Sequence, residues 1–143
     1  MDTGGFQKIL LAVDGSPSAR VASHRAAALA RFCGASVLLF HCRRSVPEYL
    51  GEPYYHRLLD RLAAQVEELL APYRLLLEES GVPFEERVLE GDPARHACEV
   101  ARLEGCDLIV LGTRGLSDLE GLFLGSVAHK VLVAAPCPVL AVR

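Results

Sequence analysis

The sequence predicts an α/β fold: one doubly wound domain over residues 1–143, with a five-stranded parallel sheet in the order 3-2-1-4-5 and helices on both faces. Short apolar runs alternate strictly with longer segments of helical character, as in successive βαβ units. Most of the runs are continuously apolar, which is typical of parallel strands covered on both sides. The length of 143 residues fits one ordinary domain, and right-handed crossovers favour the stated strand order.

The expected elements, in chain order, are the strand Lys8–Val13, the helix Pro17–Cys33, the strand Ala35–Cys42, the helix Tyr54–Glu79, the strand Pro83–Leu89, the helix Ala94–Glu104, the strand Cys106–Leu111, the helix Ser126–Ala134 and the strand Cys137–Val142. The first strand ends in turn-forming residues, among which Ser16 is a candidate N-cap and Pro17 suits the first helical position. The alanine-rich helix that follows should stop at Gly34, before the second strand.

The rest of the chain repeats these start and stop signals. The long second helix has an apolar stripe typical of a core-facing helix, and Pro72 should kink or interrupt it before Gly81 ends it. The third strand is more polar than the others, so we expect it at an outer edge of the sheet. Gly91-Asp92-Pro93 again combines a cap with a proline, Gly105 closes the third helix, and Pro136 precedes the last strand.

Composition argues against several classes of function. The net charge is −3 and 51% of the residues are apolar, which suits neither a disordered chain nor a polyanion-binding surface, so nucleic acid is not an expected partner. The apolar run Ile9–Val13 is too short for a signal-peptide core or a membrane span. The five cysteines are odd in number and have no C-x-x-C spacing, as expected of reduced thiols. We therefore expect no membrane association and a cytoplasmic location.

A glycine-rich loop after the fourth strand is the most informative feature. Gly112-Thr113-Arg114-Gly115 comes directly after the strand, and Gly125-Ser126 follows nine residues later at the start of the last helix. Glycines let a backbone turn and approach a ligand closely, and the amides at a helix N-terminus attract anions. Arg114 is a nearby cation, and the Ser126 hydroxyl can cap its helix or donate to a phosphate oxygen. The loop predicts a site for a phosphate group.

The predicted topology places a second group of residues beside this loop, at the end of the first strand. In the order 3-2-1-4-5, the first and fourth strands are neighbours where the winding reverses, and ligands bind at the carboxyl ends of such strands. These ends carry Asp14 and Gly112. Asp14 can hydrogen-bond a ribose or help to place Mg²⁺, or it can cap the turn before the first helix. His41 lies near the same edge, where a lone histidine is more often structural.

The glycine loop, together with Gly125-Ser126-Val127-Ala128, looks like the ATP-binding signature of the universal stress protein family. Four other blocks resemble strand blocks of that family: Ile9–Ser16, Val37–Cys42, Asp107–Gly115 and Val131–Val142. The likeness therefore spans nearly the whole chain, and only Arg43–Glu79 is poorly covered. The resemblance implies membership of the ATP-binding subgroup, with the fold above, a role in stress survival and usually a homodimer.

The resemblance also implies the site, residue by residue. Ala12, Val13 and Asp14 would line the nucleotide from the first strand, and Cys42 would border the adenine. The residues expected at the ribose and phosphates are Leu111, Gly112, Arg114, Gly115, Gly125, Ser126 and Val127. Mg²⁺ would be held mainly by the triphosphate, with Asp14 as an indirect contact.

The oligomeric state can be read from the last strand as well as from the resemblance. At a sheet edge, Pro138–Val142 is apolar and carries few charged blocking residues, so it should pair with a second copy of the chain. A two-fold homodimer is the simplest outcome.

The leading interpretation is an ATP-binding regulatory module of the stress response. One alternative is an ATP hydrolase or nucleotidyl transferase, for which Asp14 is the one nearby candidate base. A phosphoacceptor receiver domain fits poorly, because Val88-Leu89-Glu90 ends the third strand where the phosphoacceptor belongs. A nucleotide-free structural dimer is a further alternative. The segment Arg43–Glu79 is a candidate lid over the site.

Overall fold

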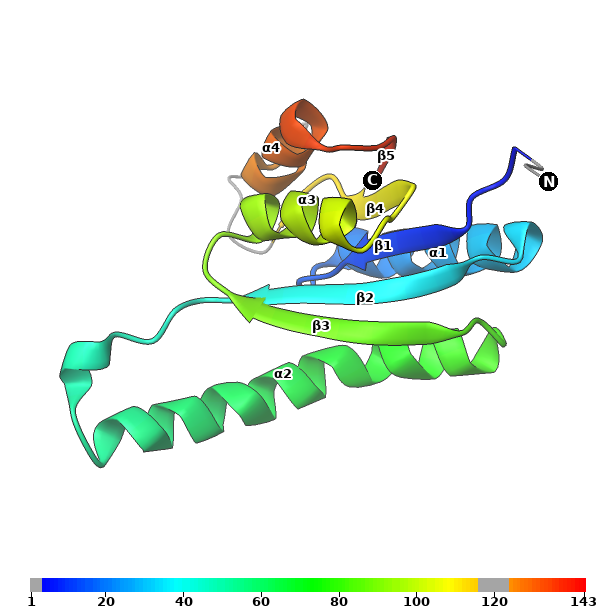
Figure 1. Cartoon of the computed structure of the whole chain (residues 1–143). Helices are drawn as coiled ribbons and strands as arrows, with labels where there is room; N and C mark the ends of the chain where they lie inside the picture. The colour runs from blue at the N-terminus through cyan, green and yellow to red at the C-terminus, as the bar shows by residue number, and fades with distance from the viewer. Residues whose placement is uncertain (1–3, 116–123) are drawn as a thin grey trace.

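The computed structural model describes residues 4–115 and 124–143, which form one parallel five-stranded sheet in the order β3-β2-β1-β4-β5 (Figure 1). The strands are β1 (Lys8–Ala12), β2 (Ser36–Arg43), β3 (Phe84–Glu90), β4 (Leu108–Gly112) and β5 (Val139–Val142). The helices are α1 (Pro17–Cys33), α2 (Tyr54–Glu79), α3 (Pro93–Leu103) and α4 (Ser126–Ala134), with a short 3-10 helix η1 (Glu48–Leu50). The predicted fold class and strand order are confirmed, and the polar β3 lies at an edge as expected.

Alternate residues of each central strand face opposite sides of the sheet and build two separate cores. On β1, for example, Ile9 and Leu11 belong to the first core and Leu10 to the second. The helical side chains of the first core come from α1 and α2 and include Ala19, Ala22, Ala26, Ala30, Leu70, Tyr73 and Leu77. Those of the second come from α3 and α4 and include Ala94, Ala97, Ala101, Ala128 and Val131. The prediction of helices on both faces is therefore confirmed.

The helix starts follow the cap signals of the sequence. Ser16 is the N-cap of α1, and its hydroxyl accepts a hydrogen bond from the Ala19 N–H at 3.2 Å. Asp92 caps α3 in the same way, accepting from the Ala94 N–H at 3.1 Å. Gly34 ends α1 in the left-handed conformation, with φ of 70°. These local caps fix where each helix leaves the carboxyl end of its strand.

The long helix α2 continues through Pro72, so of the two effects that the sequence predicted, a kink or an interruption, the interruption is wrong. A proline removes one backbone N–H and leaves the carbonyl four residues earlier without its helical partner. Pro72 and Glu68 are both exposed, so water can hydrate that carbonyl and the helix is not forced to end. Within the described residues, no helix combines the length and apolarity that a membrane span requires, α2 included.

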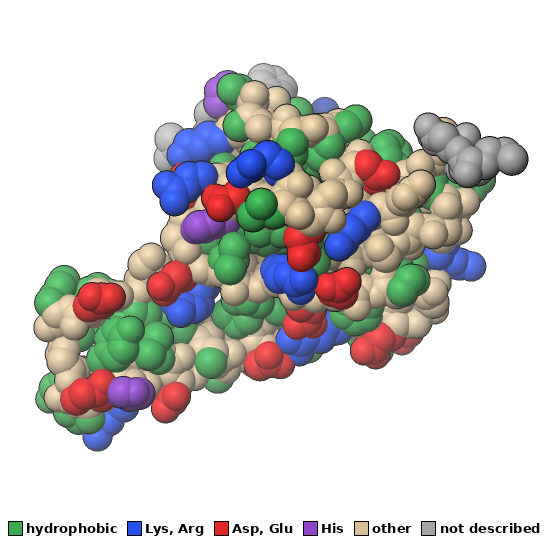
Figure 2. Space-filling view, in the orientation of Figure 1, with side chains coloured by type: hydrophobic (Ala, Val, Ile, Leu, Met, Phe, Trp, Pro, Cys, Tyr) green, Lys and Arg blue, Asp and Glu red, His purple; other side chains and the backbone are tan. Residues whose placement is uncertain are grey.

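The two halves of α2 have different surroundings. Its C-terminal half packs on the sheet and carries Arg74, which pairs with Glu86 of β3 and with Glu67 at 2.7 Å. Its N-terminal end projects beyond the sheet together with η1 (Figure 1). Figure 2 shows hydrophobic side chains at this projecting end, where Tyr49 and Tyr54 are exposed. On the same face, acidic and basic side chains are interspersed along α2 and β3.

Candidate functional site

A cavity of about 600 Å³ lies at the carboxyl ends of β1, β2 and β4. β1 pairs with β2 on one side and with β4 on the other, so the chain winds away from β1 in both directions. This is the switch point that the sequence predicts, and the volume lies within the range of about 300–1,000 Å³ found for small-molecule sites. The cavity is lined by the ends of these strands, by the starts of α1, α3 and α4, and by α2.

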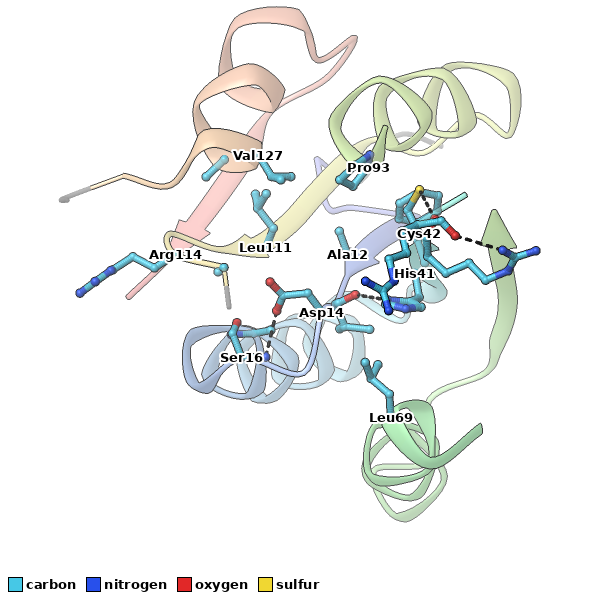
Figure 3. A pocket seen from close by; sticks show the side chains of 18 of the residues that line it. Ala12, Asp14, Ser16, His41, Cys42, Leu69, Pro93, Leu111, Arg114 and Val127 are labelled. Carbon is cyan, nitrogen blue, oxygen red and sulfur yellow. Dashed lines mark hydrogen bonds between the residues drawn. The ribbon is translucent and has the colours of Figure 1, made fainter. Parts of the chain in front are cut away.

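Asp14 lies in the turn between β1 and α1, at the centre of the cavity edge (Figure 3). Its Oδ1 accepts a hydrogen bond from the Ser16 N–H at 2.9 Å, and Gly15 between them has φ of 81°. This is the turn-capping role that the sequence suggested, and it holds the carboxylate in one orientation. Because Asp14 also lines the cavity, the capping role and a ligand-facing role coexist.

Gly112 is required for a reason that the sequence did not show. A Cβ at this position would meet the Ala19 N and the Ser18 carbonyl carbon at 2.8 Å each, and would meet Ser18 Oγ as well. The position of a Cβ at Gly112 is therefore filled by the start of α1, so packing against α1 requires the glycine, while Gly112 itself still lines the cavity. The Ser18 hydroxyl also donates to the Arg114 carbonyl oxygen at 2.7 Å, which ties the glycine loop to α1.

The two ends of the glycine loop meet at Thr113. Its N–H donates to the Val142 carbonyl at 2.7 Å, and its own carbonyl accepts from the Gly125 N–H. Residues 116–123 of the intervening segment lie outside the described residues. These two bonds bring the N-terminus of α4 beside the end of β4, and Thr113 is buried between them. Arg114 is thereby placed on the same side of the cavity as α4.

The helix α4 begins at Ser126, and Gly125 is its N-cap. Ser126 is thus the first helical residue and does not occupy the capping position that the sequence allowed for it. Ser126, Val127 and Ala128 of the first turn line the cavity. First-turn N–H groups have no acceptor within an α-helix, and the helix dipole adds positive potential there. This end of the cavity suits an anion.

Apart from two arginines at the end of β2, the walls at the opposite end of the cavity are mostly apolar. Cys42 and Pro93 lie on one side, and Leu62, Val66 and Leu69 of α2 lie on the other. Burial raises the pKa of the Cys42 thiol, and the Asp92 carboxylate raises it further, so the side chain is uncharged at neutral pH. These walls suit a flat apolar group such as a nucleobase.

Two arginines follow Cys42 at the end of β2 and also line the cavity. Arg43 pairs with Glu90 of β3 at 3.1 Å and donates to the Arg44 carbonyl oxygen at 3.1 Å. The side chain of Arg43 is therefore held toward β3, and Arg44 is exposed. The residues 4–115 and 124–143 contain no cluster of three or more His, Cys, Asp or Glu side chains suited to a metal ion.

The sequence profile of the universal stress protein family matches residues 5–143. The chain belongs to this family. It is 45% identical to a universal stress protein of Thermus aquaticus over 139 residues, covering 96% of this chain and 99% of the relative. Its structure resembles UspA from Lactobacillus plantarum with a TM-score of 0.86 at 25% identity, covering 97% and 99% of the two chains. A universal stress protein crystallised in complex with cAMP matches with a TM-score of 0.75 at 26% identity, covering 97% and 98%.

In this universal stress protein, the cavity brings together nearly all of the site residues that the sequence predicts. Gly125 is the exception, because it is buried and does not line the cavity. The lining residues that the prediction included are Ala12, Val13, Asp14, Cys42, Leu111, Gly112, Arg114, Gly115, Ser126 and Val127.

Sequence reasoning missed the wall formed by α2. Leu62, Val66 and Leu69 continue the same apolar stripe as Leu70 and Leu77, which are buried in the first core. Nothing in the periodicity separates the two groups, because both recur at helical spacing. The one available signal was position: the cavity-facing residues belong to the segment Arg43–Glu79, which was a candidate lid.

Proposed function

We propose that this universal stress protein binds ATP in the cavity, with Mg²⁺ on the triphosphate, as a nucleotide-dependent regulatory module of the stress response. The observation that carries the proposal is the polarity of one continuous cavity. An apolar end lies beside β2, and an anion-binding end lies beside β4 and α4. The free state of the cysteines supports a cytoplasmic location for this module.

The distance between the two ends fits a nucleotide. Neighbouring strands of a sheet lie about 4.8 Å apart, so β2 and β4, on either side of β1, are separated by roughly 10 Å. A base between Cys42 and Val66 can therefore extend its ribose past Asp14 and its phosphates toward Arg114. The structural relative in complex with cAMP carries an adenine nucleotide, which agrees with this choice of ligand class.

The donor set also fits the magnesium salt of a triphosphate. Phosphate oxygens accept hydrogen bonds, and the first turn of α4 together with Arg114 supplies donors and positive charge. Asp14 is the one carboxylate among the described lining residues, and its Oδ1 is already occupied by the Ser16 N–H. Mg²⁺ keeps several waters and needs few protein carboxylates when phosphates bind it. A single carboxylate that already accepts a backbone hydrogen bond is a poor candidate for a general base, so the site favours a binding module over a catalyst.

Isothermal titration of the purified chain with ATP and Mg²⁺ tests the proposal. We expect one nucleotide per chain, and we expect Arg114→Ala to weaken binding about tenfold to hundredfold, the usual effect of losing a charge-assisted hydrogen bond. Arg61→Ala is the matched control, because Arg61 is exposed on α2 and does not line the cavity. The absence of any binding heat would sink the proposal and leave a nucleotide-free structural dimer. Steady ATP turnover that Asp14→Asn abolishes would contradict the binding-module interpretation.

We also propose a homodimer through the Pro138–Val142 edge. β5 pairs with β4 on one side only among the described residues, and Leu140 on it is 37% exposed. A second copy can satisfy the open edge by strand pairing while it covers these apolar side chains.

Replacing Leu140 by lysine should therefore shift the protein toward monomer, with the dimer dissociation constant raised by about tenfold or more because a charge would be buried at the interface. Analytical ultracentrifugation measures the shift. Tyr49→Lys is the control, because Tyr49 is exposed on η1, which lies at the projecting end of α2 and away from β5 (Figure 1). A wild-type protein that sediments as a monomer at all concentrations would refute the β5 dimer.

A further inference from the structure

The orientation of the His41 ring is fixed by a single hydrogen bond. His41 is 8% exposed and lines the cavity from β2, and its Nδ1 lies 2.8 Å from the Val13 carbonyl oxygen (Figure 3). A carbonyl oxygen only accepts hydrogen bonds, so the ring nitrogen beside it must carry the proton. Nδ1–H is thus the donor, and the structural role that the sequence favoured for His41 is present.

The same bond determines what the other ring nitrogen can do. In a neutral imidazole, a proton on Nδ1 makes Nε2 an acceptor. Nε2 makes no hydrogen bond to any residue within the described ranges 4–115 and 124–143. A ring rotated by half a turn would lose the bond to Val13, so the acceptor is held in place. A largely buried ring at a cavity wall therefore carries one fixed acceptor that the protein itself does not satisfy.

The position of this acceptor matches one part of a nucleotide. His41 and Asp14 are acceptors near the ends of β2 and β1, where the Arg43 side chain is engaged by Glu90 and Arg44 is exposed. Donors are supplied beyond β4 by α4 and Arg114. Phosphate oxygens are acceptors at neutral pH and would gain nothing from Nε2. The nucleoside part has donors: the amine on C6 of adenine and the ribose hydroxyls.

We propose that His41 is a specificity-determining residue whose Nε2 accepts a hydrogen bond from the nucleoside, an inference that rests on the proposed nucleotide site. The donor is either the C6 amine or a ribose hydroxyl, and the two sources can be separated with analogues. ITP lacks the amine, 2′-deoxy-ATP and 3′-deoxy-ATP each lack one hydroxyl, and all three keep the triphosphate.

Two variants separate the two nitrogens of the ring. His41→Asn places an amide N–H near the position of Nδ1, where it can still donate to the Val13 carbonyl, and leaves nothing at the position of Nε2. His41→Gln reaches the position of Nε2 with an amide oxygen, so it restores an acceptor there. Titrations of wild type and both variants with ATP and the three analogues, at pH 8 with Mg²⁺, form a set of double-mutant cycles.

For wild type, we expect one analogue to bind about fivefold to tenfold more weakly than ATP, the usual effect of one neutral hydrogen bond. His41→Asn should weaken ATP by the same factor and bind that analogue as well as it binds ATP, and His41→Gln should recover part of the difference. Unchanged discrimination in His41→Asn would overturn the inference. Equal wild-type affinity for all four nucleotides would overturn it too, without any variant that has to fold. If wild type binds no ATP in the first titration, the proposed function itself is wrong, which distinguishes that outcome from a failure of the His41 inference alone.

Discussion

Replacing Gly112 by alanine is expected to lower the free energy of unfolding by about 3 kcal/mol, at the upper end for overpacking in a well-packed interior. The new Cβ would meet two backbone atoms of α1, Ala19 N and the Ser18 carbonyl carbon, at 2.8 Å each. These atoms lie in the first turn of a helix whose cap is the Ser16 hydroxyl, so they cannot retreat without disturbing the cap. Urea denaturation followed by circular dichroism measures the loss.

Two controls separate the backbone clash from simpler effects. Ser18→Ala removes the Oγ that the new methyl would also meet, but it leaves the two backbone atoms, so the double variant should remain destabilised. Gly105→Ala has open space around its Cβ and only a left-handed φ of 69°, so it should cost about 1 kcal/mol. A Gly112→Ala protein as stable as the Gly105→Ala protein, or one rescued by Ser18→Ala, would contradict the packing argument.

The sheet could be predicted from the sequence because each strand is recognised from its own short run of residues. The continuous apolar runs of β1, β2 and β4 indicate burial on both faces, and the polar residues of β3 indicate an edge strand. Handedness and connection rules then leave few strand orders. The strand order in turn places Asp14 and Gly112 at one switch point before any side chain is positioned.

What the sequence could not show depends on contacts between distant segments. The neighbour of Gly112 is Ser18, and only the folded structure brings β4 this close to α1. The sequence favoured a structural role for His41, and the hydrogen bond from its Nδ1 to the Val13 carbonyl is such a role. That Nε2 remains an acceptor can be inferred only once this bond is known. For α2, helical spacing predicts a buried face and cannot say whether a core or a cavity lies against it.

Gly125→Val is expected to weaken ATP binding strongly, with a smaller loss of stability than Gly112→Ala. Gly125 has φ of −71° and ψ of 165°, an extended conformation that any residue adopts, and its N–H bond to Thr113 survives the substitution. The side chain of an N-cap residue stands over the first-turn N–H groups. Gly125 is buried and does not itself line the cavity, but valine methyl groups there would project toward the first-turn donors of Ser126 and Val127, which do line it, and would exclude a phosphate.

We expect nucleotide affinity to fall about tenfold or more, because charge-assisted hydrogen bonds would be lost. Stability should fall by about 1–2 kcal/mol, because valine is a poorer N-cap than glycine and adds volume at a buried position. Titration with ATP and Mg²⁺ and urea denaturation on the same sample measure both. Gly125→Ala, with a single methyl group, should lose less affinity. Wild-type affinity in Gly125→Val would mean that the phosphates bind away from α4, whereas a loss of stability as large as that of Gly112→Ala would mean that both glycines serve packing. Only the combination of a folded chain and lost ATP assigns Gly125 to the ligand and Gly112 to the fold.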